Sequence, residues 1–311
     1  MPKQPMEDIF MIKNFNELVN NVRNQTVKKT VAVVCAHDGH TLESVDLAYR
    51  NGIAKPILIG NREKIKALIQ LHGFQLRDAE ILEESDDKEA ARKGVALVRQ
   101  GTADFLMKGL LQTADLLREV VNKESGLQRG GLMSHFGIFE VPGYHKLLVI
   151  TDGGMVPYPT ADEKAQILRN AVQVLFDLGY ETPKAAVLAA AESVNPKMPE
   201  SVDADLLKKR YEAGTLTGCI VEGPISYDLA MSLEAAEIKG YQSPVTGDAD
   251  ILLMPNMTCG NLLAKALMLN AGAKMAGMIA GASVPIVLVS RGATAEEKYL
   301  SLALSAAAAQ K

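Results

Sequence analysis

Short apolar runs alternate along the chain with longer segments that repeat hydrophobic residues at helical spacing. The run Thr30–Ala36 is rich in β-branched residues and is flanked by polar ones, which is typical of a buried strand. The same alternation predicts strands at 30–36, 55–60, 80–82 and 103–107, and helices at 16–23, 41–51, 62–73 and 88–100. Strands separated by helices of this length indicate right-handed βαβ crossovers and a parallel sheet.

A second series of the same kind begins at residue 145. It predicts strands at 145–153, 184–191, 219–224 and 249–255, and helices at 160–178, 201–213, 226–239 and 260–270. The last predicted strand, 285–290, leads through Arg291 into a helix that begins near Thr294. Both series indicate the α/β class, with three-layer domains and mostly parallel sheets.

The length of 311 residues is near the size at which one hydrophobic core divides into two. We therefore predict a first α/β domain from residues 1–136 with 282–311, and a second α/β domain from residues 137–281. The return of the final helix to the first domain places Ser290 beside the interdomain cleft. Ligands of open α/β sheets bind beyond the carboxyl ends of strands and often between domains, so this corner is a candidate site.

Composition excludes several classes of function. A net charge of −4 argues against a nucleic-acid-binding surface. The three cysteines form no CxxC pair and the five histidines show no HxxxH spacing, so we expect neither disulfides nor a metal site. No GxSxG elbow surrounds Ser290, and the histidines of His37–His40 read as part of a polar turn. With no apolar run of membrane-spanning length, a cytoplasmic protein is expected.

The segment VSRGATAEEK is the most informative part of the chain. Ser290 and Arg291 stand at the carboxyl end of a strand, and Thr294 precedes Glu297 by the spacing of a capping box. A hydroxyl, a guanidinium and free helix N–H groups at one point suit an anion or a developing negative charge. A second interpretation stays open, in which Glu296 and Glu297 only cap the helix and Arg291 pairs with a carboxylate.

The segment KGLLQTADLLR follows another predicted strand. Thr113 stands in the turn that enters its helix, and Arg118 lies more than one helical turn further on. Arg118 has two interpretations: it reaches sideways to a ligand, or it is solvated or forms a weak surface pair.

Two more corners between a strand and a helix are rich in turn residues. Gly223 and Pro224 end a predicted strand, while Asn256, Gly260 and Asn261 lie between a strand and a helix. Turn chemistry alone accounts for both segments. Their interest is that several such corners would face one cleft.

Taken together, these segments resemble the phosphate acetyltransferase and phosphate butyryltransferase family. The matching segments are QTADLLR, PYPTADEKAQI, VEGPISYDLA, DADILLMPNMTCGNLLAK and VSRGATAEEK, in the order and at the spacings of the family. The resemblance implies two α/β domains of the isocitrate and isopropylmalate dehydrogenase fold, assembled as a homodimer or larger homo-oligomer. It also implies reversible transfer of a short acyl group between coenzyme A and inorganic phosphate, with coenzyme A as a substrate and no permanently bound cofactor.

The same resemblance implies roles for individual residues. The thiolate of coenzyme A would attack the acyl carbonyl directly, without a covalent acyl-enzyme. Ser290 would orient the thiol, Arg291 would neutralise the phosphate and the tetrahedral charge, and Glu297, or alternatively Glu296, would take the thiol proton. A free thiol has a pKa of about 8.5, so a base and a cation nearby both help to form the nucleophile. Arg118 corresponds to an arginine associated with the anionic end of coenzyme A.

Two departures from the acetyl branch of the family point to the butyryl branch. Glu297 replaces the aspartate that the acetyl branch has after its Ser-Arg-Gly, and Met268 replaces an arginine that follows a helix resembling LLAKAL. A methionine suits a longer, apolar acyl chain, although ordinary core packing is the alternative for Met268. We therefore predict a phosphate butyryltransferase, with phosphate acetyltransferase as the alternative. A non-catalytic or dehydrogenase-like nucleotide-binding protein is disfavoured because no GxGxxG follows the first strand.

Overall fold

The computed structural model describes residues 11–290 and 292–309, which divide into two compact units, each with its own hydrophobic core. The first unit comprises residues 18–139 and 273–309, and the second comprises residues 11–17 and 140–272. Among the helices of these residues, none combines the length and the apolar composition needed to cross a bilayer.

The strands of the first unit lie in the order β3-β2-β1-β4-β11-β10-β5. They are β1 (Lys29–Val34), β2 (Ala54–Gly60), β3 (Glu80–Glu83), β4 (Phe105–Lys108), β5 (Ser134–Glu140), β10 (Lys274–Ala280) and β11 (Ile286–Val287). Strand β4 pairs in parallel with both β1 and β11, and β10 is antiparallel to β11. The carboxyl ends of β1, β4 and β11 therefore meet at one edge of the sheet.

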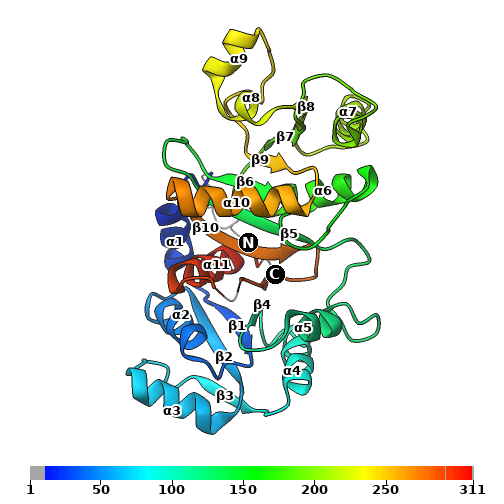
Figure 1. Cartoon of the computed structure of the whole chain (residues 1–311). Coiled ribbons are helices and arrows are strands. Elements are labelled where there is room, and N and C mark those ends of the chain that lie inside the picture. Colours follow the sequence, from blue (N-terminus) through cyan, green and yellow to red (C-terminus); the bar gives the residue numbers. More distant parts are fainter. Residues whose placement is uncertain (1–10, 291, 310–311) are drawn as a thin grey trace, which may run out of the picture. The chain divides into compact units, whose positions relative to one another are not determined.

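Helices cover both faces of this sheet (Figure 1). They are α2 (Gly39–Arg50), α3 (Arg62–His72), α4 (Asp87–Arg99), α5 (Thr113–Val120) and α11 (Ala295–Ala308), and α1 (Phe15–Asn24) precedes β1. The chain moves outward from β1 to β3 and then returns to β4, so right-handed crossovers place α2 and α3 opposite α4. Helix α11 packs against α2 and β10.

The second unit has four parallel strands in the order β6-β9-β7-β8. They are β6 (Leu148–Thr151), β7 (Lys184–Leu188), β8 (Ile220–Ile225) and β9 (Ile251–Leu253). The helices are α6 (Ala161–Asp177), α7 (Pro199–Glu212), α8 (Tyr227–Met231), α9 (Leu233–Lys239) and α10 (Met257–Ala271). Helix α10 packs against β6, and α6 packs against α7.

The structure corrects several details of the sequence prediction. Strands β5 and β10 were not predicted, and only Ile286–Val287 of the predicted strand 285–290 is a strand. The predicted helix 226–239 is two helices, because Ser232 ends α8 and its hydroxyl caps α9 by accepting the Ala235 N–H at 3.1 Å. Residues 273–281, predicted in the second domain, belong to the first unit because β10 pairs with β11.

Candidate active site

Ser290 lies at the corner where the chain passes from β11 to α11. Its side chain is exposed, and its hydroxyl accepts a hydrogen bond from the Gly292 N–H at 3.4 Å. Its carbonyl accepts a second bond from the Ala293 N–H at 3.0 Å. The turn after the strand thus folds back on Ser290. The neighbouring candidate, Arg291, lies outside the described residues.

The capping box predicted at the start of α11 is confirmed. Thr294 Oγ1 accepts the Glu297 N–H at 3.1 Å, and Glu297 Oε2 accepts the Thr294 N–H at 3.0 Å. Glu296, the alternative acid, instead forms an ion pair with Lys274 at 2.7 Å. The two candidate acids therefore differ in their surroundings: Glu297 is half-buried at the helix start, and Glu296 is exposed.

Thr113 and Arg118 lie on α5, after the carboxyl end of β4. The chain leaves β4 through Gly109, whose N–H donates to the Val34 carbonyl at 2.8 Å. A Cβ at Gly109 would lie only 2.4 Å from the Cys35 carbonyl oxygen, so this close approach requires glycine. Thr113 is exposed at the first position of the helix. Arg118 forms an ion pair with Asp115 at 2.9 Å on the surface. This is the second of its two interpretations, a weak surface pair.

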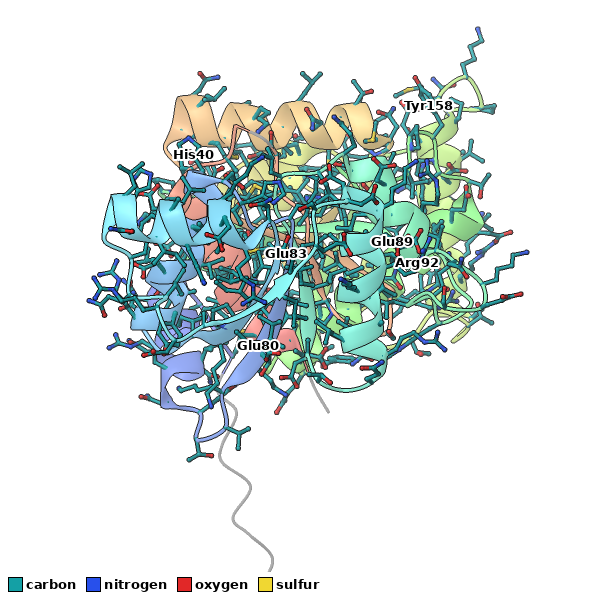
Figure 2. The ribbon with its side chains drawn as sticks, turned by 90° about the horizontal axis from the view of Figure 1, so that it is seen from below. His40, Glu80, Glu83, Glu89, Arg92 and Tyr158 are labelled. Atoms are coloured by element: carbon teal, nitrogen blue, oxygen red, sulfur yellow. The ribbon has the colours of Figure 1, made fainter. Side chains whose placement is uncertain are left out.

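The corner after β1 has features that the sequence did not reveal. Cys35 has a positive φ of 54°, an uncommon conformation for a residue other than glycine and one that clusters at functional sites. Burial, together with the nearby Asp87 carboxylate, raises the pKa of the Cys35 thiol far above its usual range, which disfavours the nucleophilic thiolate form. Asp38 caps α2, so the predicted polar turn is limited to the residues before Gly39, and His40, in the first turn of the helix, is 87% exposed (Figure 2). The buried Nδ1 of His37 has no hydrogen-bond partner among the described residues.

In the second unit, Asn256 caps α10, and its side chain accepts the Cys259 N–H at 3.0 Å. Gly260 is buried, and the Asn261 side chain donates to the Gly153 carbonyl at 3.3 Å. Gly153 follows the carboxyl end of β6, which lies next to β9 in the sheet. Three predicted residues thus gather where β6 and β9 end.

The sequence analysis missed Asp152, which precedes Gly153. Its side chain is 2% exposed, and its Oδ1 accepts the N–H groups of Gly154 and Met155 at 2.7 and 2.8 Å. An aspartate-glycine pair after a strand looks like an ordinary turn. The only signal in the sequence was a carboxylate at the end of the apolar run LLVIT.

Gly223 and Pro224 do not end a strand as predicted, because β8 continues to Ile225 and both residues are buried. They line a cavity of about 210 Å³ at β8, the strand at the end of the order β6-β9-β7-β8, so β7 separates this strand from β9. Its other lining residues include four carboxylates and two lysines: Glu192, Asp205, Glu212, Glu222, Lys208 and Lys209. With more carboxylates than lysines, this cavity does not suit a phosphate.

Met268 is half-buried on α10, seven residues after Asn261 and therefore on nearly the same face of the helix. Its partial exposure leaves open both a core role and contact with a ligand. Among the described residues, no group of three histidine, cysteine or acidic side chains is placed to hold a metal ion.

Each unit thus collects polar groups at the carboxyl ends of its strands. In the first unit, Ser290 and Thr113 follow the adjacent parallel strands β11 and β4. In the second, Asn256, Gly260 and Asn261 follow β9 beside the turn after β6. Exposed hydroxyls and helix N-termini at such an edge can bind anionic groups and can stabilise charge that develops during group transfer.

Comparison with known proteins defines the class of enzyme. A family model described as Phosphate acetyl/butaryl transferase matches residues 86–306. A phosphate butyryltransferase from Clostridium acetobutylicum is 44% identical over 95% of this chain and 98% of its own length. A phosphate acetyltransferase from Thermotoga maritima is 41% identical over 89% of this chain and 94% of its own length.

A solved structure is similar as well. The crystal structure of a branched-chain phosphotransacylase from Enterococcus faecalis V583 superimposes with a TM-score of 0.80 at 34% identity, and covers 90% of this chain and 99% of that one. The fold is therefore that of a phosphate acyltransferase. The chain belongs to the phosphate acetyl/butaryl transferase family.

Proposed function

We propose that this chain catalyses the reversible transfer of a short acyl group, butyryl or one of similar length, between coenzyme A and inorganic phosphate. The observation that carries this proposal is the Ser290 corner, where an exposed hydroxyl stands at a strand end directly before a capped helix. The 44% identity to a phosphate butyryltransferase supports it.

In the proposed reaction, the thiolate of coenzyme A attacks the carbonyl carbon of the acyl phosphate. A carbon–sulfur bond forms, the bond between the carbonyl carbon and the phosphate oxygen breaks, and phosphate leaves. Ser290 orients the thiol, Arg291 neutralises the phosphate and the tetrahedral oxyanion, and Glu297 takes the thiol proton. Half-burial of Glu297 beside the turn supports it over the exposed Glu296 as the base.

Coenzyme A, in this proposal, is a substrate rather than a resident cofactor. Arg118 and Thr113 receive the anionic end of coenzyme A, where Arg118 would exchange Asp115 for a phosphate. The start of α10 contacts the substrates through Asn256, Gly260 and Asn261. Gly223 and Pro224, buried beside carboxylates, would contact only an uncharged part of the coenzyme.

The preference for a particular length of acyl chain is supported by fewer observations than acyl transfer itself. Met268 in place of an arginine supports an apolar acyl tail. The 41% identity to a phosphate acetyltransferase keeps acetyl transfer as the alternative.

We further propose that the two compact units, residues 18–139 with 273–309 and residues 11–17 with 140–272, are domains of the isocitrate and isopropylmalate dehydrogenase fold. In this proposal the enzyme works in the cytoplasm as a homodimer or larger homo-oligomer.

Initial rates with a series of acyl-CoA substrates, from acetyl to valeryl, test the function directly. With inorganic phosphate as acceptor, release of free thiol should be fastest with butyryl-CoA or a neighbour in the series. A higher rate with acetyl-CoA would favour the alternative. No release of thiol from any member of the series would refute acyl transfer to phosphate.

A further inference from the structure

Asp152 is a buried carboxylate at the carboxyl end of β6. Removing a carboxylate from water is costly unless hydrogen bonds compensate it. Here Oδ1 accepts two backbone bonds, from Gly154 at 2.7 Å and from Met155 at 2.8 Å. These charge-assisted bonds hold the turn from Asp152 to Met155 in one conformation.

This turn lies directly against the first turns of α10. A Cβ at Gly260 would lie 2.6 Å from the Asp152 carbonyl oxygen, and a Cβ at Gly153 would lie 3.2 Å from the Gly260 carbonyl carbon. Only glycine at position 260 allows this approach, and a Cβ at position 153 would require a small shift of the backbone. The turn after β6 therefore determines where the start of α10 can lie.

Two hydrogen bonds tie the same segments together. The Asn261 side chain donates to the Gly153 carbonyl at 3.3 Å, and the Met257 N–H donates to the Pro157 carbonyl at 3.1 Å. A shift of the turn would therefore move both the backbone and the side chain of Asn261.

We propose that Asp152 is a positioning residue for acyl transfer: its carboxylate fixes the turn after β6, and this turn places Gly260 and Asn261 for binding of substrate. The inference rests on the proposed function, which puts these two residues at the substrate. An error of about 1 Å in such groups can cost on the order of a hundredfold in rate.

Asp250 provides a matched control in the same unit. It is 4% exposed, and it also accepts a backbone hydrogen bond, from Lys184 at 2.7 Å. It precedes β9, however, and so lies at the amino ends of the strands, away from the candidate site. Both carboxylates contribute to folding, but only Asp152 borders α10.

The experiment compares Asp152→Ala, Asp152→Asn and Asp250→Ala by steady-state kinetics with butyryl-CoA and phosphate, and by thermal unfolding. We expect Asp152→Ala to lower kcat/KM per folded enzyme at least about thirtyfold. Asp152→Asn should restore it to within about threefold, because the amide oxygen can accept both N–H bonds. Asp250→Ala should lower the melting temperature but leave kcat/KM within about twofold.

A double-mutant cycle separates positioning from folding. The double variant Asp152→Ala with Asn261→Ala should lose less transition-state stabilisation, calculated from kcat/KM, than the sum of the losses in the two single variants. The reason is that both substitutions act on the same contact. If Asp152→Ala does not fold, Gly153→Ala tests the same contact, since its Cβ pushes the turn away from Gly260 and should raise KM. Unchanged kcat/KM in these variants, or equal losses in Asp152→Asn and Asp152→Ala, would overturn the inference. Inactive wild-type enzyme would instead overturn the proposed function.

Discussion

Ser290 is exposed after the two-residue strand β11, so its hydroxyl is not part of the packed core, and the proposed function assigns it to the orientation of the thiol. We predict that Ser290→Ala lowers kcat about a hundredfold, the loss expected for a positioning group in the transition state, while the melting temperature changes by less than about 1 °C. Steady-state rates and thermal unfolding check both values. Ser85→Ala, which removes another exposed hydroxyl, is the control and should leave kcat unchanged. A similar kcat in both variants would exclude Ser290 from the site.

Arg118 allows a test that depends on the chemistry of the coenzyme. We predict that Arg118→Ala raises KM about tenfold for butyryl-CoA, but no more than about twofold for the analogue of butyryl-CoA without the 3′-phosphate. The difference is expected because only butyryl-CoA carries the phosphate that the guanidinium would bind. Initial rates at varied substrate concentration provide the comparison. Arg92 on α4 is the control, since it is 57% exposed and pairs with Glu89 three residues earlier (Figure 2), as Arg118, 60% exposed, pairs with Asp115. Arg92 differs in a second, longer ion pair, with Glu119 at 3.6 Å. Equal effects on the two coenzymes would remove Arg118 from the phosphate site.

How far single residues can be assigned from sequence depends on how local their signals are. Ser290 and Glu297 could be proposed as site residues because a strand end, a turn and a cap follow each other within a few residues. Asp152 was missed because its significance comes from contact with α10, and the bond from Asn261 to Gly153 spans 108 positions. Periodicity and spacing carry no information about such a contact.

Among the elements, the same distinction separates confirmed predictions from missed ones. Helices with polar caps, such as α6 and α11, begin where the sequence indicates. Strands β5 and β10 were missed because SHFGIFE and KMAGMIA contain glycine and few β-branched residues. Their pleat is stabilised by neighbours in the sheet rather than by their own composition. The prediction of one long helix at 226–239 was wrong for a local reason, because Ser232 caps a second helix there.

The two capping boxes offer a test of what the start of α11 does. Glu297 in α11 and Glu163 in α6 cap their helices in the same way, so Ala at either position should lower the melting temperature. Gln keeps the cap but cannot take a proton at neutral pH. We therefore predict that Glu297→Gln preserves the melting temperature and lowers kcat about a hundredfold, whereas Glu163→Gln preserves both. Thermal unfolding and kcat are measured on all four variants. Full activity of Glu297→Gln would limit Glu297 to the cap.

At the scale of the whole molecule, the candidate substrate residues and a cluster of charged residues lie at opposite ends of the strands in the second unit. The candidate substrate residues follow the carboxyl ends of β6 and β9. Before the amino ends of β6, β7 and β9, an ion cluster joins Asp248 and Asp250 to Lys146, Lys184 and His145. Lys146 is only 7% exposed, and two carboxylates compensate its charge. The sequence predicted the strands but not this cluster, because its members are up to 105 positions apart.

This cluster makes stability depend on pH in a defined direction. Burial opposes ionisation of Asp248, but hydrogen bonds from Lys146, Lys184 and His145 outweigh it and hold its pKa far below the usual range. A carboxyl whose pKa is lower in the folded state stabilises the protein above its unfolded pKa of about 3.9, and that contribution is lost as the pH falls toward the folded value.

We predict that Asp248→Asn destabilises the protein by about 1 kcal/mol at pH 7, a value reduced for the partial exposure of the carboxylate, and by progressively less below about pH 4. Circular dichroism melts of both proteins at pH 7, 4 and 3 measure the difference. Asp205→Asn breaks an isolated surface pair with Lys209 and should change the melting temperature by less than about 1 °C throughout. Asp248 would be shown to have no special role if the difference between wild type and Asp248→Asn were the same at pH 3 as at pH 7.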